Sequence, residues 1–130
     1  MGEHANVARL RSGYEAFTRG DLEALRDLFA EDIVWHVPGD NKISGDYAGQ
    51  DATFGYFGKL MELSGGTFKT KLHEILASDG HGVGLHRDTA DRDGKTLDTE
   101  EVLIFHMRDG KVSEAWEAYP DHGAFDAFWS

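Results

Sequence analysis

Among the titratable residues, His36 has the setting most suited to chemistry. It lies between Trp35 and Val37, in a stretch of β-branched and aromatic residues that ends at Pro38. A titratable group held in apolar surroundings is suited to general acid or base work, and imidazole titrates near neutral pH. The stretch therefore predicts either a catalytic histidine on a strand or a neutral core histidine bonded to a backbone carbonyl.

Several other chemistries lack their motifs. Cysteine is absent, which excludes disulfides, thiolate metal sites and cysteine nucleophiles. The seven histidines include no tight ligand spacing such as HExxH, and no GxSxG elbow occurs. The glycine-rich run at residues 80–84 has neither a P-loop nor a dinucleotide-binding pattern. We expect no metal and no cofactor.

Composition narrows the class of protein. A chain of 130 residues with 40% hydrophobic residues fits a single domain over 1–130 with a real core. The net charge of -11 argues against nucleic-acid binding, because that role needs a basic surface. No apolar run approaches the ~20 residues that cross a bilayer, and the N-terminus lacks a signal-peptide core. We expect a cytoplasmic protein without a membrane partner.

The first half of the chain reads as helices around one strand. A first helix, ended by Gly20, carries an apolar stripe at helical spacing. Its members are Val7, Leu10, Tyr14 and Phe17. Asp21 is the expected cap of a second helix, a strand follows over residues 33–37, and a short extended piece spans 43–48. Asp51 is the expected cap of a third helix, which runs to about residue 63 and carries Phe54 and Phe57.

The second half reads as a meander of antiparallel strands. Alternation predicts strands over residues 68–76, 82–90, 97–107 and 112–119. Asp-Gly turn signals within 91–94 and at 109–110 separate the last three. Helices followed by a long meander predict an α+β fold, with helices on one face of a curved sheet.

The strand over residues 97–107 has apolar residues on both faces. Glu101 shares one face with Leu103 and Phe105, while Val102 and Ile104 lie on the other. Because the helices can cover only one face, we expect a homodimer through the sheet. The alternative is that a loop or the aromatic C-terminal run at 124–129, otherwise expected over the pocket mouth or across the dimer, covers this face.

For several individual side chains the sequence allows two interpretations. Glu101 is either buried, and then paired or protonated, or solvated at a frayed strand start. Tyr14 is either a pocket hydroxyl or a core aromatic. His86 and Arg87 are neighbours on one strand, so one faces the interior and the other does not, and the sequence does not decide which.

The chain resembles the nuclear transport factor 2-like superfamily, in its SnoaL-like and ketosteroid isomerase-like branch. The resemblance rests on the order of elements and on three segments. These are GDLEALRDLFAEDIVWHVPG, ISGDYAG and DGKTLDTEEVLIFHMRDGKVSEAW. It implies a cone-shaped, strongly curved mixed sheet wrapped around N-terminal helices, an apolar pocket and a dimer. This fold hosts enzymes and non-catalytic binders alike, so function has to be argued from the site.

The resemblance also implies residue roles. His36 falls on the position of the catalytic base, Glu101 on that of the hydrogen-bonding acid, and Tyr14 lies one residue from the third partner. Histidine and glutamate here replace aspartates in the family pattern. The expected walls of the pocket are Trp35, Phe54, Phe57, Leu103, Phe105 and Trp116.

The sequence therefore favours an isomerase-like or cyclase-like enzyme. It would remove a proton next to the carbonyl of a small lipophilic compound whose identity the sequence does not give. The alternative is a non-catalytic module of the same fold that binds a hydrophobic ligand or only dimerises.

Overall fold

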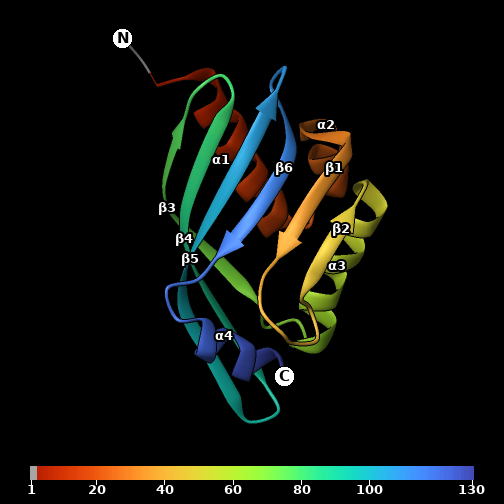
Figure 1. The fold of residues 1–130 in the computed structure, drawn as a ribbon, viewed down its shortest axis with the longest axis vertical. Coiled ribbons are helices and arrows are strands. Elements are labelled where there is room, and N and C mark those ends of the chain that lie inside the picture. The colour runs from red at the N-terminus through yellow and green to blue at the C-terminus, as the bar shows by residue number, and fades with distance from the viewer. Residues whose placement is uncertain (1–2) are drawn as a thin grey trace.

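A computed structural model describes residues 3–130 as one six-stranded sheet with helices packed on it (Figure 1). The strand order is β2-β1-β6-β5-β4-β3. The helices are α1 (Ala5–Arg19), α2 (Leu22–Leu28), α3 (Gln50–Leu63) and α4 (His122–Trp129). The strands are β1 (Phe29–Val37), β2 (Gly45–Ala48), β3 (Lys69–Ala77), β4 (His81–Arg92), β5 (Lys95–Arg108) and β6 (Lys111–Ala118).

The predicted boundaries of the helices hold with one exception. Gly20 ends α1 in the left-handed region at φ 69°, and Asp21 caps α2 by accepting from the backbone N–H of Ala24 at 3.1 Å. The exception is α3, where the cap is Gly49 at φ 90° and not Asp51. A left-handed turn is needed there to leave β2, and glycine supplies it without strain.

The predicted meander is confirmed. β3, β4, β5 and β6 pair in antiparallel order, and Asp93 and Gly94, both at positive φ, make the tight turn between β4 and β5. β1 pairs with β6 in the parallel sense, with His36 opposite Trp116, so the sheet is mixed. The α+β class and the curved mixed sheet expected from the resemblance are therefore observed.

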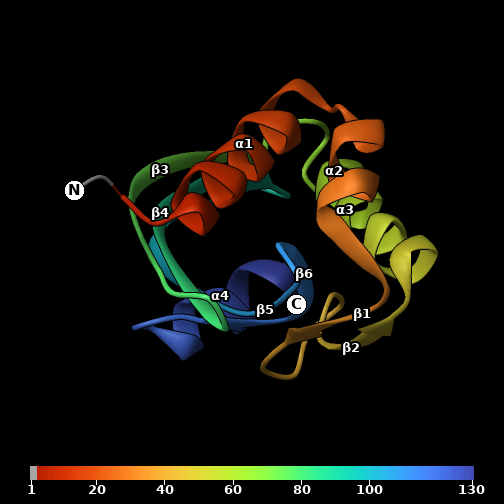
Figure 2. The same cartoon turned by 90° about the horizontal axis from the view of Figure 1, so that it is seen from above.

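The sheet bends around the first helix. Seen from above, it curves from β3 round to β1 and β2, with α1 lying across the opening and α3 along the far side (Figure 2). Inward residues of β5 such as Leu103 and Phe105 are buried, whereas Ile104 on the outer face is 39% exposed. The concave face therefore holds the core, and the convex face is free of helices in its central strands.

The C-terminal aromatic run forms α4, which packs against β5. Phe125, Phe128 and Trp129 are buried, and the Phe125 ring stacks on Tyr119 at 3.9 Å. None of these side chains lines the apolar cavity described below. No helix among residues 3–130 has the length and hydropathy that crossing a membrane demands.

Close packing of α1 on the sheet depends on glycines in β4. A Cβ at Gly84 would overlap the Tyr14 hydroxyl, and one at Gly82 would overlap the Leu10 side chain. The two glycines share one face of the strand because they are two residues apart. Because they lack side chains, they leave the space that Leu10 and Tyr14 of α1 occupy against β4.

We predict that Gly84→Ala lowers the free energy of unfolding by about 1–3 kcal/mol, the usual cost of overpacking a core. Chemical denaturation would measure it. Gly58→Ala is the control, because a Cβ there meets nothing within 4 Å on α3. Helix propensity makes the control neutral or stabilising by up to about 1 kcal/mol. Equal effects of the two changes would contradict the packing argument.

Candidate active site

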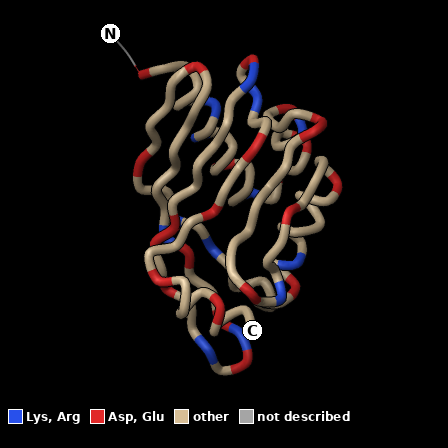
Figure 3. The backbone as a smooth tube through the Cα atoms, in the orientation of Figure 1, with Lys and Arg blue, Asp and Glu red and all other residues tan. Residues whose placement is uncertain are grey.

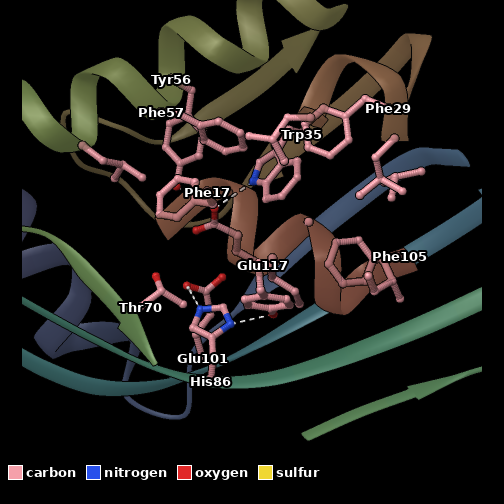
Figure 4. Close-up of a pocket in the computed structure, with 18 of the residues that line it drawn as sticks. Phe17, Phe29, Trp35, Tyr56, Phe57, Thr70, His86, Glu101, Phe105 and Glu117 are labelled. Carbon is pink, nitrogen blue, oxygen red and sulfur yellow. Dashed lines mark hydrogen bonds and ion pairs between the residues drawn. The ribbon is translucent and has the colours of Figure 1, made fainter. Parts of the chain in front are cut away.

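An apolar cavity of about 70 Å³ lies between the helices and the concave face of the sheet (Figure 4). Its walls come from α1, α2, α3 and five of the strands. Its apolar lining is Leu10, Gly13, Phe17, Leu25, Leu28, Phe29, Trp35, Phe57, Leu60, Phe68, Leu103, Phe105 and Val112. Its polar lining is Tyr14, Tyr56, Thr70, His86, Asp88, Glu101 and Glu117.

Most of the predicted site residues meet at this cavity. Tyr14 and Glu101 reach it from α1 and β5, and four of the predicted wall residues line it. These are Trp35, Phe57, Leu103 and Phe105. His86 also lines it, while its neighbour Arg87 lies on the outer face and pairs with Asp98 at 2.5 Å. The structure thus decides between His86 and Arg87.

His36 does not face the cavity, so its predicted place in the pocket is wrong. Trp35 points inward, and alternation along β1 turns His36 to the convex face. There its two ring nitrogens lie 2.6 Å from Asp46 and 2.6 Å from Glu114. Although burial lowers the pKa of His36, the hydrogen bonds to these two carboxylates outweigh it and raise that pKa overall.

Trp116 and Phe54 are also outside the cavity. Trp116 stacks on the His36 ring on the convex face, at a centroid distance of 5.2 Å. The inward positions on β6 are Ala115 and Glu117 instead. Phe54 lies on α3 behind the lining, where its ring stacks on Phe29 at a centroid distance of 5.9 Å and the Arg26 guanidinium carbon lies 4.8 Å from it.

A hydrogen-bonded relay crosses one wall of the cavity. The Tyr14 hydroxyl lies 2.7 Å from His86 Nδ1. On the far side of the ring, His86 Nε2 lies 3.1 Å from Asp88 and 3.1 Å from Glu101. Asp88 also accepts from the Thr70 hydroxyl at 2.9 Å. A histidine oriented by a carboxylate and bonded to a hydroxyl is an arrangement that can move protons.

Glu117 is a second titratable group on the wall. Its carboxylate accepts from Trp35 Nε1 at 2.8 Å, from the Tyr56 hydroxyl at 2.5 Å and from the Tyr119 hydroxyl at 2.9 Å. Burial raises the pKa of Glu117 to about 7, against the lowering effect of these donors. A carboxylate with a pKa near neutrality is a well-matched general base.

Glu101 and Glu117 cannot both be ionised, because they share the Tyr119 hydroxyl as a hydrogen-bond partner. The Tyr119 oxygen lies 2.6 Å from a Glu101 oxygen and 2.9 Å from a Glu117 oxygen, yet a hydroxyl carries a single proton. Tyr119 can donate to only one of them at a time, and the carboxyl that lacks this proton has to carry its own. Glu117 already accepts from Trp35 and Tyr56, which assigns the neutral form to Glu101.

The protonation of the other carboxyls agrees with this assignment. Burial, with the nearby charges of Glu117 and Asp88, raises the pKa of Glu101 well above its ordinary value. Burial alone would raise the pKa of Asp88 too, but hydrogen bonds with Glu101 and His86 lower it overall. No lysine or arginine lines the cavity within residues 3–130. The site therefore holds an ionised Asp88, a neutral Glu101 and a Glu117 that titrates near neutral pH.

The same wall contains a possible set of metal ligands. His86, Asp88 and Glu101 each present one ligand atom, and these atoms lie within 4.8 Å of one another. A divalent ion there would have to replace the protons that now link the groups, because metal ligands must be deprotonated. The hydrogen bonds already satisfy these atoms, so the geometry favours proton transfer over metal binding.

The inward position of Glu117 could not be inferred from the sequence because of a β-bulge. The pairing of β5 with β6 shifts between His106 and Met107, which breaks strict alternation on β6. Val112 and Glu117 both point inward although one is even and the other odd in number. His86 and Asp88, two residues apart, carried a visible signal as two polar residues on one face, but nothing showed that this face was the inner one.

Comparisons with known proteins agree on the fold. The SnoaL-like domain family model matches residues 10–115. The uncharacterized protein Rv0034 of Mycobacterium tuberculosis is 31% identical over the whole of both chains. The structure of Bal32a, from a soil-derived mobile gene cassette, shares 41% identity, covers 96% of each chain and superposes with a TM-score of 0.92. An NTF2-like protein of Burkholderia xenovorans superposes with a TM-score of 0.84 at 23% identity, covering 100% of this chain and 99% of its own.

We predict that the free energy of unfolding falls as pH rises from about 4.5 to about 7. Glu117 has a higher pKa in the folded chain than its ordinary 4.5, so the folded state binds more protons across this window. By linkage, stability is then lost as pH rises, by up to about 1.4 kcal/mol per pH unit for one group. Denaturation at several pH values would show a smaller slope in Glu117→Gln.

His36→Gln is the control for this measurement. The pKa of His36 is also raised, so its stabilising contribution is present below 6.5 and is lost at higher pH than that of Glu117. Removing it should change the slope above about pH 6.5 and leave the acidic part unchanged. An unchanged slope in Glu117→Gln below that pH would contradict the assignment.

Proposed function

The chain belongs to the SnoaL-like domain family, and we propose that it is an enzyme that transfers a proton next to the carbonyl group of a small lipophilic compound. One observation carries the proposal: a carboxylate that titrates near neutral pH and a hydroxyl backed by histidine face the same apolar cavity. The carboxylate is Glu117 and the hydroxyl is that of Tyr14. The outcome would be isomerisation or aldol-type cyclisation.

Glu117 is the proposed base, in the role that the family resemblance implied for His36. Its carboxylate would take the proton on the carbon next to the carbonyl, and the electron pair of that C–H bond would move to the carbonyl oxygen as an enolate. Trp35 and Tyr56 hold the carboxylate in place by their hydrogen bonds. A rigidly held base saves the entropy of positioning it during the reaction.

Tyr14 is the proposed donor to the enolate oxygen. When His86 is neutral, the Tyr14 hydroxyl can donate to Nδ1, and when His86 is protonated, Nδ1–H donates to Tyr14. The second state frees the hydroxyl proton for the substrate and places a positive charge behind it. Asp88, lying 3.1 Å from Nε2, stabilises that imidazolium. Donors preorganised toward a developing oxyanion are among the strongest contributors to catalysis.

Glu101 is proposed to keep the hydrogen bonds between Tyr119 and Glu117 in place. As a neutral acid hydrogen-bonded to Asp88, it does not need the Tyr119 proton, so Tyr119 can donate to Glu117 and stabilise its ionised form. The step uses only side chains of this chain and returns the proton to the product carbon or oxygen.

The cavity sets an upper size for the reacting part of the substrate. Its volume of about 70 Å³ is smaller than the roughly 150 Å³ of an engineered apolar cavity that holds benzene. A single ring therefore requires some movement of the wall, and a fused polycycle would not fit inside.

We further propose that the convex face pairs with a second copy of the chain. Cross-strand neighbours Leu76, Val83, Ile104 and Trp116 form an apolar row across β3, β4, β5 and β6. Leu76 is 54% and Ile104 39% exposed, unusual values for large apolar side chains on a sheet. Sheet faces of this kind favour a symmetric dimer.

Binding of 4-nitrophenol, a one-ring mimic of an enolate, tests the donor. We expect the bound phenol to have a lowered pKa in the native chain, seen in its absorbance. Tyr14→Phe should weaken phenolate binding by about 10- to 100-fold, because a hydrogen bond to a charged group is worth about 1.5–3 kcal/mol. Phenolate binding that is equal in the two proteins would contradict the role of Tyr14.

Deuterium exchange at the carbons next to the carbonyl of cyclohexanone tests the base. We expect the native chain to catalyse exchange, measured by NMR in D₂O, and Glu117→Gln to lower its rate by about 10²- to 10⁴-fold. The variant should still bind 4-nitrophenol, which shows that its pocket is intact. A native chain that binds the phenol yet exchanges no proton would favour the non-catalytic binding module instead.

Sedimentation tests the dimer. Ile104→Glu should convert a native dimer to a monomer, because it places a charge in the centre of the apolar row. Leu22→Glu is the matched control, since Leu22 is 46% exposed on α2, away from that row. A native chain that sediments as a monomer would refute the pairing.

A further inference from the structure

A second hollow adjoins the cavity at the free edge of the sheet. Its volume is about 530 Å³, far larger than that of the cavity itself. Its lining is Phe17, Thr18, Met61, Gly66, Phe68, Lys69, Thr70, Lys71, Arg87 and Thr89. We call it the edge groove. Phe17, Phe68 and Thr70 line both the edge groove and the cavity, so these three side chains are the partition between them.

The edge groove is lined from both faces of β3, the last strand of the sheet. Thr70 faces inward, where its hydroxyl donates to Asp88, while Lys69 and Lys71 alternate with it and are exposed. The apolar side chains in the groove are Phe17, Met61 and Phe68, and Met61 is 43% exposed. A ligand lying in the groove would therefore meet apolar surface beside positive charge.

The charge of the edge groove runs against that of the chain. Asp and Glu outnumber Lys and Arg by 24 to 13, and acidic residues are spread along the whole backbone (Figure 3). The groove nevertheless has three cationic residues and no acidic one in its lining. Asp98 neutralises Arg87 at 2.5 Å. Lys69 and Lys71 have no ion pair with any residue that the structure describes.

The cavity behind the partition has the opposite character. Its charged groups are carboxyls, and no lysine or arginine lines it among residues 3–130. A ligand carboxylate inside the cavity would be repelled by Asp88 and Glu117 and would have to shed its water, whereas a phenolate or enolate oxygen there is stabilised by the Tyr14 donor. An amphipathic anion can therefore bind in one orientation only, with its apolar ring inside and its charge in the groove.

We propose that the edge groove binds a carboxylate carried by the substrate, which makes the substrate a one-ring carbonyl compound with an acidic side chain. This inference rests on the proposed function, because it takes the cavity to be the reaction site. Lys69 and Lys71 bind the carboxylate, and the groove accommodates the chain that joins it to the ring. The competing explanation is that edge-strand lysines only prevent pairing with another sheet edge.

Calorimetric titration with two matched probes tests the proposal. The probes are 3-(4-hydroxyphenyl)propanoate and 3-(4-hydroxyphenyl)propanamide, which share the phenol ring and differ in charge. We expect the native chain to bind the acid about 3- to 10-fold more tightly than the amide, the range that two exposed ion pairs provide. The preference should shrink when salt is raised, because exposed charges are screened.

The double variant Lys69→Gln/Lys71→Gln should bind the two probes equally, with its affinity for the amide unchanged. Lys42→Gln/Lys59→Gln is the control, because it removes two exposed lysines that line neither hollow. It should keep the preference for the acid, since the net charge changes equally. Thermal unfolding would confirm that both variants fold.

The possible outcomes distinguish failure of the groove proposal from failure of the cavity as the reaction site. Equal binding of acid and amide by the native chain, or an acid preference that survives in Lys69→Gln/Lys71→Gln, overturns the groove proposal and leaves the cavity chemistry standing. Failure of both probes to bind the native chain overturns the cavity as a phenol-binding site, and the groove proposal with it.

Discussion

The burial of Asp88, Glu101 and Glu117, with no lysine or arginine from residues 3–130 lining the cavity, constrains the rest of this structure. Carboxyls at 0%, 4% and 8% exposure cannot all be ionised, since isolated buried charges cost many kcal/mol. This cost is lowered because Glu101 keeps its proton and because hydroxyl groups such as that of Tyr119 donate hydrogen bonds to the carboxyls. The donors come from separate parts of the chain, among them Trp35 on β1, Tyr56 on α3 and Tyr119 after β6, so the bonds that satisfy the acids also link the layers.

The contacts of these carboxyls depend on the close approach of α1 to β4 and on the inward turn of Glu117 on β6. Tyr14 can reach His86 only because Gly84 leaves room for its hydroxyl against β4. Glu117 can face Trp35 and Tyr56 only because a bulge in the pairing of β5 with β6 turns it inward. Both features are local irregularities in otherwise regular elements. Such irregularities are often found next to functional sites, where they aim a side chain.

Periodicity and turn chemistry were enough to predict the elements and the α+β class, because they are local, whereas the cone-shaped mixed sheet was expected from the family resemblance. The glycine and aspartate at 20 and 21 end one helix and cap the next, and the alternation of Leu103 and Phe105 marks the inner face of β5. The site depends on non-local facts. Whether Glu117 or Trp116 points inward is decided by a bulge, and whether His36 or Trp35 does is decided by which face the helices cover. Neither can be inferred from the spacing of apolar residues on a single strand.

The titratable groups on the two faces of β1 and β6 differ in how their charge affects the stability of the fold. On the convex face, His36 lies between Asp46 and Glu114, and these partners favour its charged form and stabilise the fold. On the concave face, Glu117 has a pKa of about 7, which means that ionising it in the folded chain costs stability. An apolar residue there would remove that cost, since buried ionic groups can often be replaced without loss of stability. A charge that weakens the fold, held by Trp35 and Tyr56 and directed at an apolar cavity, is the feature on which the proposed role of Glu117 as a base rests.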